Sequence, residues 1–437
     1  MRKTISFIVL MACMQVFALP HYELAYRLSG AGAMIMPDGK VDKWIDRPVL
    51  GGQFAVEFLP TGRWHCLQQW NNASIGVGVS YLNLGNEAKL GSAFAAYGYM
   101  NQPFYNGKHF RIGVRPSVGL AAVTKRYSNT LPEGVIPYHQ DRFSETNQSI
   151  GSILNAYLAM ELFMDFPIKD GWEITLAGGW HHISNGSVMH PNAGYNLFGA
   201  ELGVRYHPLH QGTKNKEQGL YEPPTPDVPK KLYDGVDKPW AVEISATGGM
   251  KQNYYADNQN GQRFYGVATL KAAAYWVPVS IFRIGGGFDA FYDGYYSAVS
   301  SKLPNAVAAN PNAPVTYFGK TYLSESDAKN CFRVGFSIQP EFIIGRLTAG
   351  IHVGFYIFDP VKNLEPFEAV EANGGKPLDR GIFYNYDFTK ASNYQDGWCY
   401  MQFVMKYHVL DHMFVQLGLK THGVRAEFID AGIGVAF

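Results

Sequence analysis

Charge, cysteine and long apolar runs are all scarce in this chain of 437 residues. Only 17% of the residues are charged and the formal net charge is +1, so the sequence offers no basic surface for nucleic acid or another polyanion. Beyond the first twenty residues, no segment reaches the roughly 20 uninterrupted apolar residues that a membrane-spanning helix needs. Nucleic-acid binding and an α-helical membrane fold are therefore excluded, which leaves a water-soluble protein or a β-barrel.

Three cysteines follow the first twenty residues, namely Cys66, Cys331 and Cys399. Because they are widely spaced, they exclude both a disulfide framework and a zinc site. At most one disulfide can form, and we expect it to join Cys331 to Cys399. Since histidine, aspartate and glutamate show no metal-ligand spacing either, we predict neither a metal nor a cofactor.

The first eighteen residues have the composition of a secretory signal peptide. Arg2 and Lys3 precede an apolar stretch, and the small residue Ala18 suits cleavage directly after it. An alternative interpretation takes Leu10–Cys13 as the cleavage box of a lipoprotein, although the apolar core would then be short. We predict export, with residues 1–18 removed.

Aromatic residues and glycine are abundant, at 15% and 47 residues, and apolar residues alternate with small or polar ones along most of the chain. Phe110–Val118 and Leu347–Ile357 are clear examples of this period of two, which is typical of β-strands. The segments are about 10 residues or longer, the length that a tilted strand needs to cross a bilayer. The last strand ends on Phe437 and resembles the sorting signal of bacterial outer-membrane barrels. The sequence predicts an all-β, antiparallel transmembrane barrel.

About sixteen strands are expected from this pattern. Their ranges are 22–36, 49–59, 73–83, 92–102, 109–123, 151–166, 172–184, 195–207, 240–255, 262–277, 280–293, 331–340, 343–358, 397–407, 411–421 and 426–437. Long connections follow odd-numbered strands and tight turns follow even-numbered ones. Because outer-membrane barrels have long outer loops and short periplasmic turns, odd strands are expected to run outward.

One polar, proline-rich connection, residues 209–238, departs from this rule and is read as a periplasmic linker. It divides the chain into a first unit, 19–208, and a second unit, 239–437. Eight strands suffice to close a barrel whose interior is filled by side chains. We therefore favour two eight-stranded barrels over one barrel of sixteen strands.

The candidate site lies where the seventh expected strand meets the eighth. Continuing the apolar face of Trp172–Trp180 by steps of two reaches His182 and Ser184, and the apolar face of the eighth strand reaches Asn196. In a barrel this face meets lipid, where polar groups are costly unless they are paired or catalytic. The placement suits an enzyme whose substrate is itself a lipid.

These residue types fit acyl transfer. Ser184 would attack an ester carbonyl, His182 would take its proton, and Asn196 would hold the imidazole through a ring N–H. Asn185 and nearby backbone amides, including that of Ser187, would form the oxyanion hole.

The stretch around this site resembles the lipid A 3-O-deacylase (PagL-type) and acyloxyacyl hydrolase family of outer-membrane barrel enzymes. The family motif runs His-x-Ser-Asn-Ala-Gly, then Pro-Asn and an acidic residue. His182, Ser184 and Asn185 match its start, and Pro191, Asn192 and Gly194 match the spacing of its middle. The family's glutamate falls on Asn196, and Asn-Ala-Gly is replaced by Asn-Gly-Ser at 185–187.

The resemblance implies an outer-membrane serine esterase that acts on lipid A, the lipid part of lipopolysaccharide, among the lipids of the outer leaflet. A homodimer is the assembly considered. The alternative is a barrel without enzymatic activity, a channel or a binding protein. The second unit places His422 and Glu427 between its last two strands with no serine beside them, so we expect it to be non-catalytic.

Overall fold

The computed structural model describes residues 24–37, 41–59, 65–127, 147, 149–208, 239–252, 264–295, 316–317, 320–321, 328–359, 399–423 and 425–437. The expected signal peptide, residues 1–18, and the expected linker, residues 209–238, lie outside these ranges. None of the helices in the described ranges is both long and apolar enough to cross a membrane.

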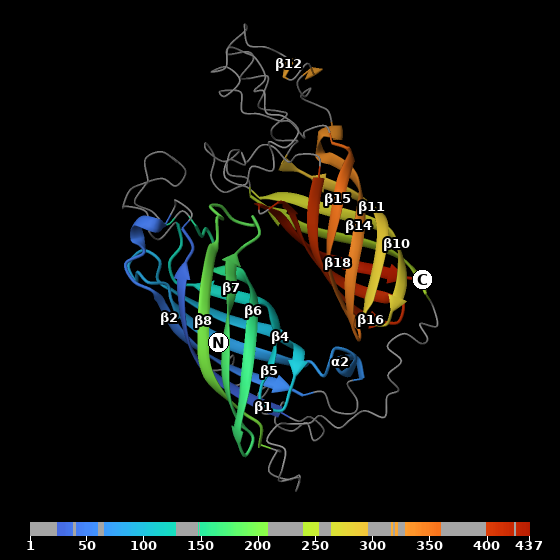
Figure 1. Ribbon diagram of the computed structural model, residues 1–437. Coiled ribbons are helices and arrows are strands. Elements are labelled where there is room, and N and C mark those ends of the chain that lie inside the picture. The colour runs from blue at the N-terminus through green and yellow to red at the C-terminus, as the bar shows by residue number, and fades with distance from the viewer. Residues whose placement is uncertain are drawn as a thin grey trace, which may run out of the picture. The chain divides into compact units, whose positions relative to one another are not determined.

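The first half of the chain forms a closed antiparallel barrel in which each strand pairs with its neighbours in sequence and β1 pairs with β8 (Figure 1). Its strands are β1 (Leu24–Ile35), β2 (Val49–Phe58), β3 (Ser74–Asn83), β4 (Ser92–Asn106), β5 (Arg111–Val123), β6 (Leu154–Lys169), β7 (Trp172–Ser184) and β8 (Tyr195–Tyr206). Two short helices, η1 (Asp42–Trp44) and α2 (His65–Gln69), lie in its connections.

The second half forms another closed barrel, in which β18 pairs with β9. Its strands are β9 (Trp240–Lys251), β10 (Tyr265–Val279), β11 (Phe282–Asp293), β14 (Phe332–Ile344), β15 (Leu347–Phe358), β16 (Cys399–Leu410), β17 (Met413–His422) and β18 (Arg425–Ala436). A small two-stranded sheet, β12 (Thr316–Tyr317) with β13 (Lys320–Thr321), and the short helix η5 (Ala328–Cys331) lie between β11 and β14.

The predicted fold is confirmed, and so is the preference for two eight-stranded barrels over one of sixteen strands. Because tight turns link even-numbered to odd-numbered strands, the strand boundaries could be predicted from the sequence. Between β6 and β7, for example, Asp170 and Gly171 have φ values of 52° and 84°, the left-handed backbone of a two-residue hairpin turn. Short turns of this kind fix the register of the strands on either side.

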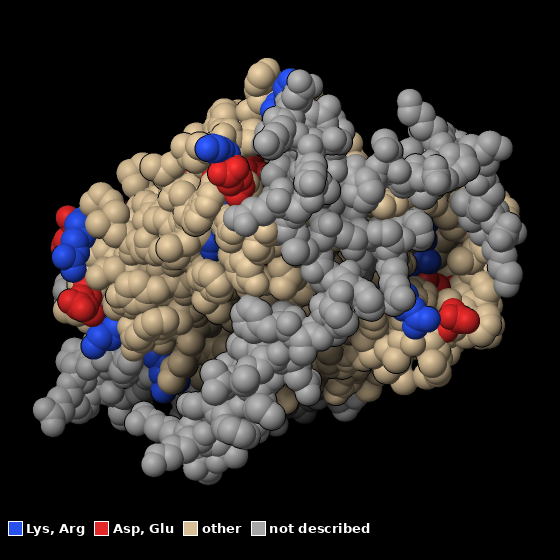
Figure 2. All heavy atoms as spheres, turned by 90° about the horizontal axis from the view of Figure 1, so that it is seen from below, with Lys and Arg blue, Asp and Glu red and all other residues tan. Residues whose placement is uncertain are grey.

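Each barrel is apolar outside. Large exposed apolar side chains occupy alternate positions on every barrel strand, as shown in the first barrel by Leu28, Phe54, Val79, Phe94, Leu120, Leu162, Leu176 and Leu202 and in the second by Val242, Leu270, Phe288, Ile338, Ile351, Phe403, Leu417 and Ile433. In Figure 2, the charged side chains of the described part are a few separate groups on an otherwise uncharged surface. A wall of this kind is suited to lipid rather than water.

The interior of the first barrel is filled by paired charges. Glu201 accepts hydrogen bonds from both Arg27 and Arg115, the former at 3.1 Å. Arg205 donates to Glu57 at 2.7 Å, and Arg111 pairs with Asp165. Apart from Arg111, which is partly exposed, these arginines and carboxylates are buried, so the lumen is a packed polar core.

The second barrel has the same construction. Arg283 pairs with Glu243 and Glu341, and Lys406 donates to both of these carboxylates, at 2.7 and 2.6 Å. Asp289 accepts from Tyr400 at 2.6 Å. Arg283 and Asp289 therefore belong to polar networks inside the second barrel.

The expected disulfide between Cys331 and Cys399 is wrong, since neither cysteine forms a disulfide. Cys399 begins β16, whereas Cys331 immediately precedes β14, and β15 lies between these two strands. Two strand spacings amount to about 9.5 Å, which exceeds the roughly 4.4–6.8 Å between the Cα atoms of a disulfide.

Removal of the Glu201 carboxylate should destabilise the first barrel. Glu201→Gln leaves the buried guanidinium groups of Arg27 and Arg115 without their shared counter-charge, and breaking a buried pair in this way costs about 3 kcal/mol or more. Urea unfolding, followed by the heat-modifiable mobility of the barrel in electrophoresis, measures the loss. Lys169→Gln is the matched control, because Lys169 and its partner Asp170 are largely exposed. Equal unfolding midpoints for the two variants would contradict the expectation.

Candidate active site

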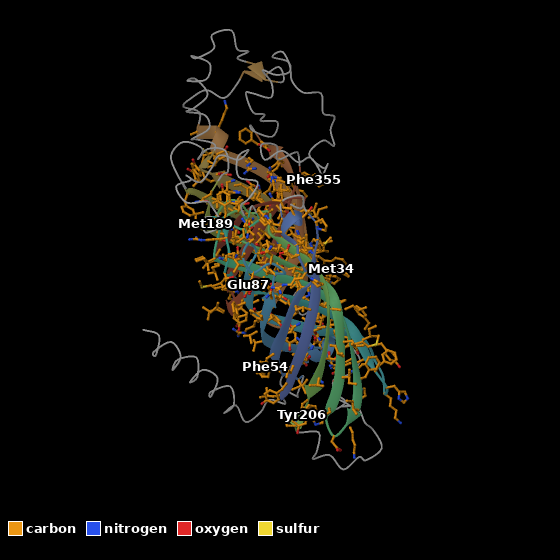
Figure 3. The ribbon with its side chains drawn as sticks, turned by 90° about the vertical axis from the view of Figure 1, so that its left-hand side faces the viewer. Met34, Phe54, Glu87, Met189, Tyr206 and Phe355 are labelled. Carbon is orange, nitrogen blue, oxygen red and sulfur yellow. The ribbon has the colours of Figure 1, made fainter. Side chains whose placement is uncertain are left out.

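Strand β7 keeps its alternation to its end. Trp172, Ile174 and Leu176 are exposed, whereas Glu173, Thr175 and Ile183 are buried toward the lumen. His182 and Ser184 continue the parity of the exposed set, although His182 is only partly exposed and Ser184 is buried. In Figure 3, Tyr206, the last residue of β8, lies at the lower end of the first barrel, and Met34, near the end of β1, lies farther up. Since β7 is antiparallel to β8, His182 and Ser184 lie at the end of the barrel opposite Tyr206.

Three side chains of β7 and β8 meet on the outer face. His182 lies opposite Asn196 in the strand register, and Trp180 lies opposite Phe198. The Asn196 Oδ1 atom is 2.8 Å from His182 Nδ1 and 3.2 Å from Trp180 Nε1. The Trp180 and His182 rings stack, with centroids 5.4 Å apart and planes inclined by 17°.

The indole fixes which nitrogen of His182 carries the proton. An indole nitrogen is only a donor, so the atom of Asn196 that it contacts must be the amide oxygen. The same oxygen faces His182 Nδ1, and since an oxygen of this kind only accepts, Nδ1 must be the protonated nitrogen. Nε2 is then the unprotonated nitrogen, as a general base requires.

The chain turns sharply after Ser184. The amide of Val188 donates to the carbonyl of Asn185 at 3.2 Å, and Gly186 and Ser187 have φ values of 60° and 68°. These values define a type I′ turn over residues 185–188. Ser187 holds a left-handed backbone that non-glycine residues rarely adopt, so its conformation depends on the surrounding contacts.

Asn185 makes several hydrogen bonds next to this turn. Its backbone amide donates to Asn192 Oδ1 at 2.8 Å, and its side-chain amide donates to Ser152 Oγ at 2.7 Å and to the Met189 carbonyl at 2.9 Å. Its side-chain oxygen accepts from the Met189 amide at 3.1 Å. All donors of Asn185 are therefore engaged within the loop, and the side chain acts as a clamp on the turn.

The structure thus brings His182 and Asn196 together and places Ser184 at the start of the turn that contains Asn185 and Ser187. Trp180, Asn192 and Ser152 were missed as parts of this arrangement. Trp180 has the same parity as His182 two residues away, so its neighbourhood was readable from the sequence. Ser152 was not readable, because its contact joins positions 33 residues apart.

His181 and His422 point inward. His181 Nδ1 is 2.8 Å from the Tyr157 hydroxyl, and its Nε2 is 3.5 Å from Glu161. In the second barrel, His422 Nε2 is 2.8 Å from the Tyr356 hydroxyl, and its Nδ1 is 3.4 Å from Glu427. Within the described ranges, no group of three or more histidine, cysteine, aspartate or glutamate residues is arranged to hold a metal ion.

Two protein-family profiles match the chain. The profile described as lipid A 3-O-deacylase (PagL) matches residues 53–205, and the one described as acyloxyacyl hydrolase, C-terminal domain, matches residues 240–368 and 382–437. Together the two profiles cover strands of both barrels. No curated protein matches the chain.

Several solved structures of membrane barrels are similar to the chain, over 40% to 96% of its length. Neisserial surface protein A is 10% identical over 42% of this chain and 97% of its own, with a TM-score of 0.27. The outer-membrane enzyme PagL is 12% identical over 40% of this chain and 97% of its own, with a TM-score of 0.24. OccD3 of Pseudomonas aeruginosa is 10% identical over 96% of this chain and 91% of its own, with a TM-score of 0.21.

Substitution of Asn185 should loosen the loop. Asn185→Ala removes three side-chain hydrogen bonds, each worth about 0.5–1.5 kcal/mol, so amide exchange across residues 185–192 should accelerate at least about tenfold. Asn185→Asp, which keeps an acceptor for the Met189 amide but loses both donors, should give an intermediate rate. Hydrogen exchange read by mass spectrometry compares the two variants with the parent. Unchanged exchange in Asn185→Ala would show that the side chain does not clamp the turn.

Proposed function

We propose that this chain hydrolyses an acyl ester of lipid A, with Ser184 as nucleophile and His182 as base. The chain belongs to the lipid A 3-O-deacylase (PagL) and acyloxyacyl hydrolase family of outer-membrane barrels. One observation carries the proposal. A histidine on the lipid-facing wall has its Nδ1 atom 2.8 Å from the Asn196 amide oxygen, which leaves Nε2 as the unprotonated nitrogen, two residues from a serine of the same strand and parity.

The reaction follows from these positions. Ser184 Oγ attacks the ester carbonyl while His182 Nε2 takes the hydroxyl proton, and the tetrahedral intermediate collapses to an acyl-serine. In this collapse the bond between the carbonyl carbon and the ester oxygen of the sugar breaks, and the departing sugar alkoxide takes the proton from His182 Nε2. Water then attacks the acyl-serine by the same route and releases the fatty acid with the serine restored.

Negative charge on the tetrahedral oxygen needs donors. We assign them to the turn over residues 185–188, where Ser187 would offer its backbone amide and Asn185 would keep the turn in place. A single donor of this kind is typically worth about 3 kcal/mol of transition-state stabilisation. Because every donor of Asn185 is already engaged, its contribution would be through the shape of the loop.

The acyl chain of the substrate has an apolar wall to lie against. Directly below His182 and Asn196, the outward row of the sheet consists of Trp180, Phe198 and Met34, which pair across β7, β8 and β1. All three side chains are exposed, Met34 to 67%. A lipid in the outer leaflet could therefore present its ester to Ser184 without entering a lumen.

Ion conduction, the alternative function, is opposed by the interior of both barrels. The described lumen residues form networks of buried arginine, lysine, aspartate and glutamate in mutual contact. A water-filled pathway would have to break these pairs, each at a cost of several kcal/mol. Export with removal of residues 1–18, a non-catalytic role for residues 239–437 and a homodimer remain predictions from the sequence.

Ser184→Ala should abolish deacylation while the barrel still folds. The substitution removes the nucleophilic hydroxyl and leaves the backbone of β7 unchanged, so heat-modifiable mobility should be unchanged. Lipid A from cells that produce either protein is compared by mass spectrometry, and the parent should yield a species lighter by one acyl chain. If the lipid A spectra are the same with the parent and with Ser184→Ala, Ser184 is not the nucleophile.

Asn196→Glu should raise kcat several-fold. A carboxylate can accept from His182 Nδ1 as the amide does, and its charge also stabilises the imidazolium that forms in the transition state. Asn196→Gln provides the same length without the charge and should not show the gain. A clear loss of activity in Asn196→Glu, with folding intact, would show that Asn196 does not orient His182.

A further inference from the structure

We propose that Trp180 is a positioning residue whose indole N–H holds the Asn196 amide oxygen toward His182 and thereby keeps the proton of His182 on Nδ1. The catalytic consequence rests on the proposed function above. The tautomer itself is a property of the folded protein and does not depend on any substrate.

The geometry brings two donors to a single acceptor. Trp180 Nε1 and His182 Nδ1 both lie within 3.2 Å of Asn196 Oδ1, at 3.2 and 2.8 Å. Trp180 also stacks on the imidazole, so one aromatic side chain contacts both members of the pair. Trp180 is two residues from His182 on the same face of β7, which places its ring against both without a long-range contact.

An asparagine needs such a partner because its two ends are nearly the same shape. Rotation of the amide by a half-turn replaces the acceptor oxygen with a donor NH₂ at the same place. An ionised carboxylate has two acceptor oxygens, so the same rotation changes nothing. A glutamate or aspartate at position 196 would therefore accept from the histidine in either rotation of its side chain. An asparagine accepts in only one of its two rotations.

The wrong amide orientation would disable the base. With its NH₂ group toward His182, Asn196 would donate to Nδ1, and the proton of the neutral imidazole would move to Nε2. Nε2 would then have no lone pair for the Ser184 hydroxyl. The Trp180 N–H opposes this state, because the rotated amide would set one N–H group against another.

The first experiment reads the tautomer directly. Full-length protein labelled with ¹⁵N-histidine is studied in detergent micelles at about pH 8.5, well above the ordinary histidine pKa, and His182→Gln assigns the signals. The parent should show His182 protonated at Nδ1. Trp180→Phe, which keeps the ring but removes the N–H, should show a substantial Nε2–H population. Full retention of Nδ1–H in Trp180→Phe would overturn the proposal.

The second experiment asks whether the effect depends on the amide. With lipopolysaccharide as substrate, Trp180→Phe should lower kcat about tenfold, the equivalent of one lost hydrogen bond, with KM changed less than twofold. In the Asn196→Asp background, whose side chain has the same shape but no donor, the same substitution should cost less than twofold. An equal loss in both backgrounds would mean that the indole acts only by packing, and would overturn the proposal.

Trp172→Phe is the matched control. Trp172 is another outward tryptophan of β7, packed on Tyr206 with ring centroids 4.5 Å apart, and it contacts neither His182 nor Asn196 through any described interaction. It should leave both the tautomer and kcat unchanged. Failure of the proposed function would appear differently, as a parent protein without activity whose His182 tautomer still responds to Trp180→Phe.

Discussion

A sheet closed on itself divides the side chains of every strand between two surroundings, and the remaining features of this chain follow from that division. Outside, apolar residues meet lipid and leave polar groups no solvent to satisfy them. Inside, arginine and lysine meet glutamate and aspartate at hydrogen-bond distance. A polar residue on the outer face must therefore find its partners along the wall itself, and His182 finds them in Asn196 and Trp180.

The division also explains why so much of the fold could be predicted from the sequence. Alternation of two faces is a local property, visible within ten residues, and a one-residue slip would move every side chain to the wrong side. Tight turns such as Asp170–Gly171 fix each hairpin from its own few residues. The eight-plus-eight arrangement was signalled by the polar, proline-rich connection between the eighth and ninth strands.

The candidate site was harder to predict from the sequence than the fold. His182 and Asn196 share a face by parity and are directly opposite in the β7–β8 register, so their meeting followed from counting. The engagement of Asn185 did not, because its partners Ser152 and Met189 belong to irregular loops without a period. The Cys331–Cys399 disulfide failed for a related reason, since sequence spacing does not reveal that β15 separates them.

The replacement of the family's glutamate by Asn196 changes what holds the histidine. A carboxylate orients an imidazole by charge and accepts from any direction available to its two oxygens. An amide has no charge and only one acceptor atom, so its orientation must be set by something else. In this barrel the atom that sets it is the indole nitrogen of Trp180, which can only donate. Trp180 of β7 thus compensates for the missing carboxylate in the orientation of His182. It does not replace the charge that would stabilise the imidazolium.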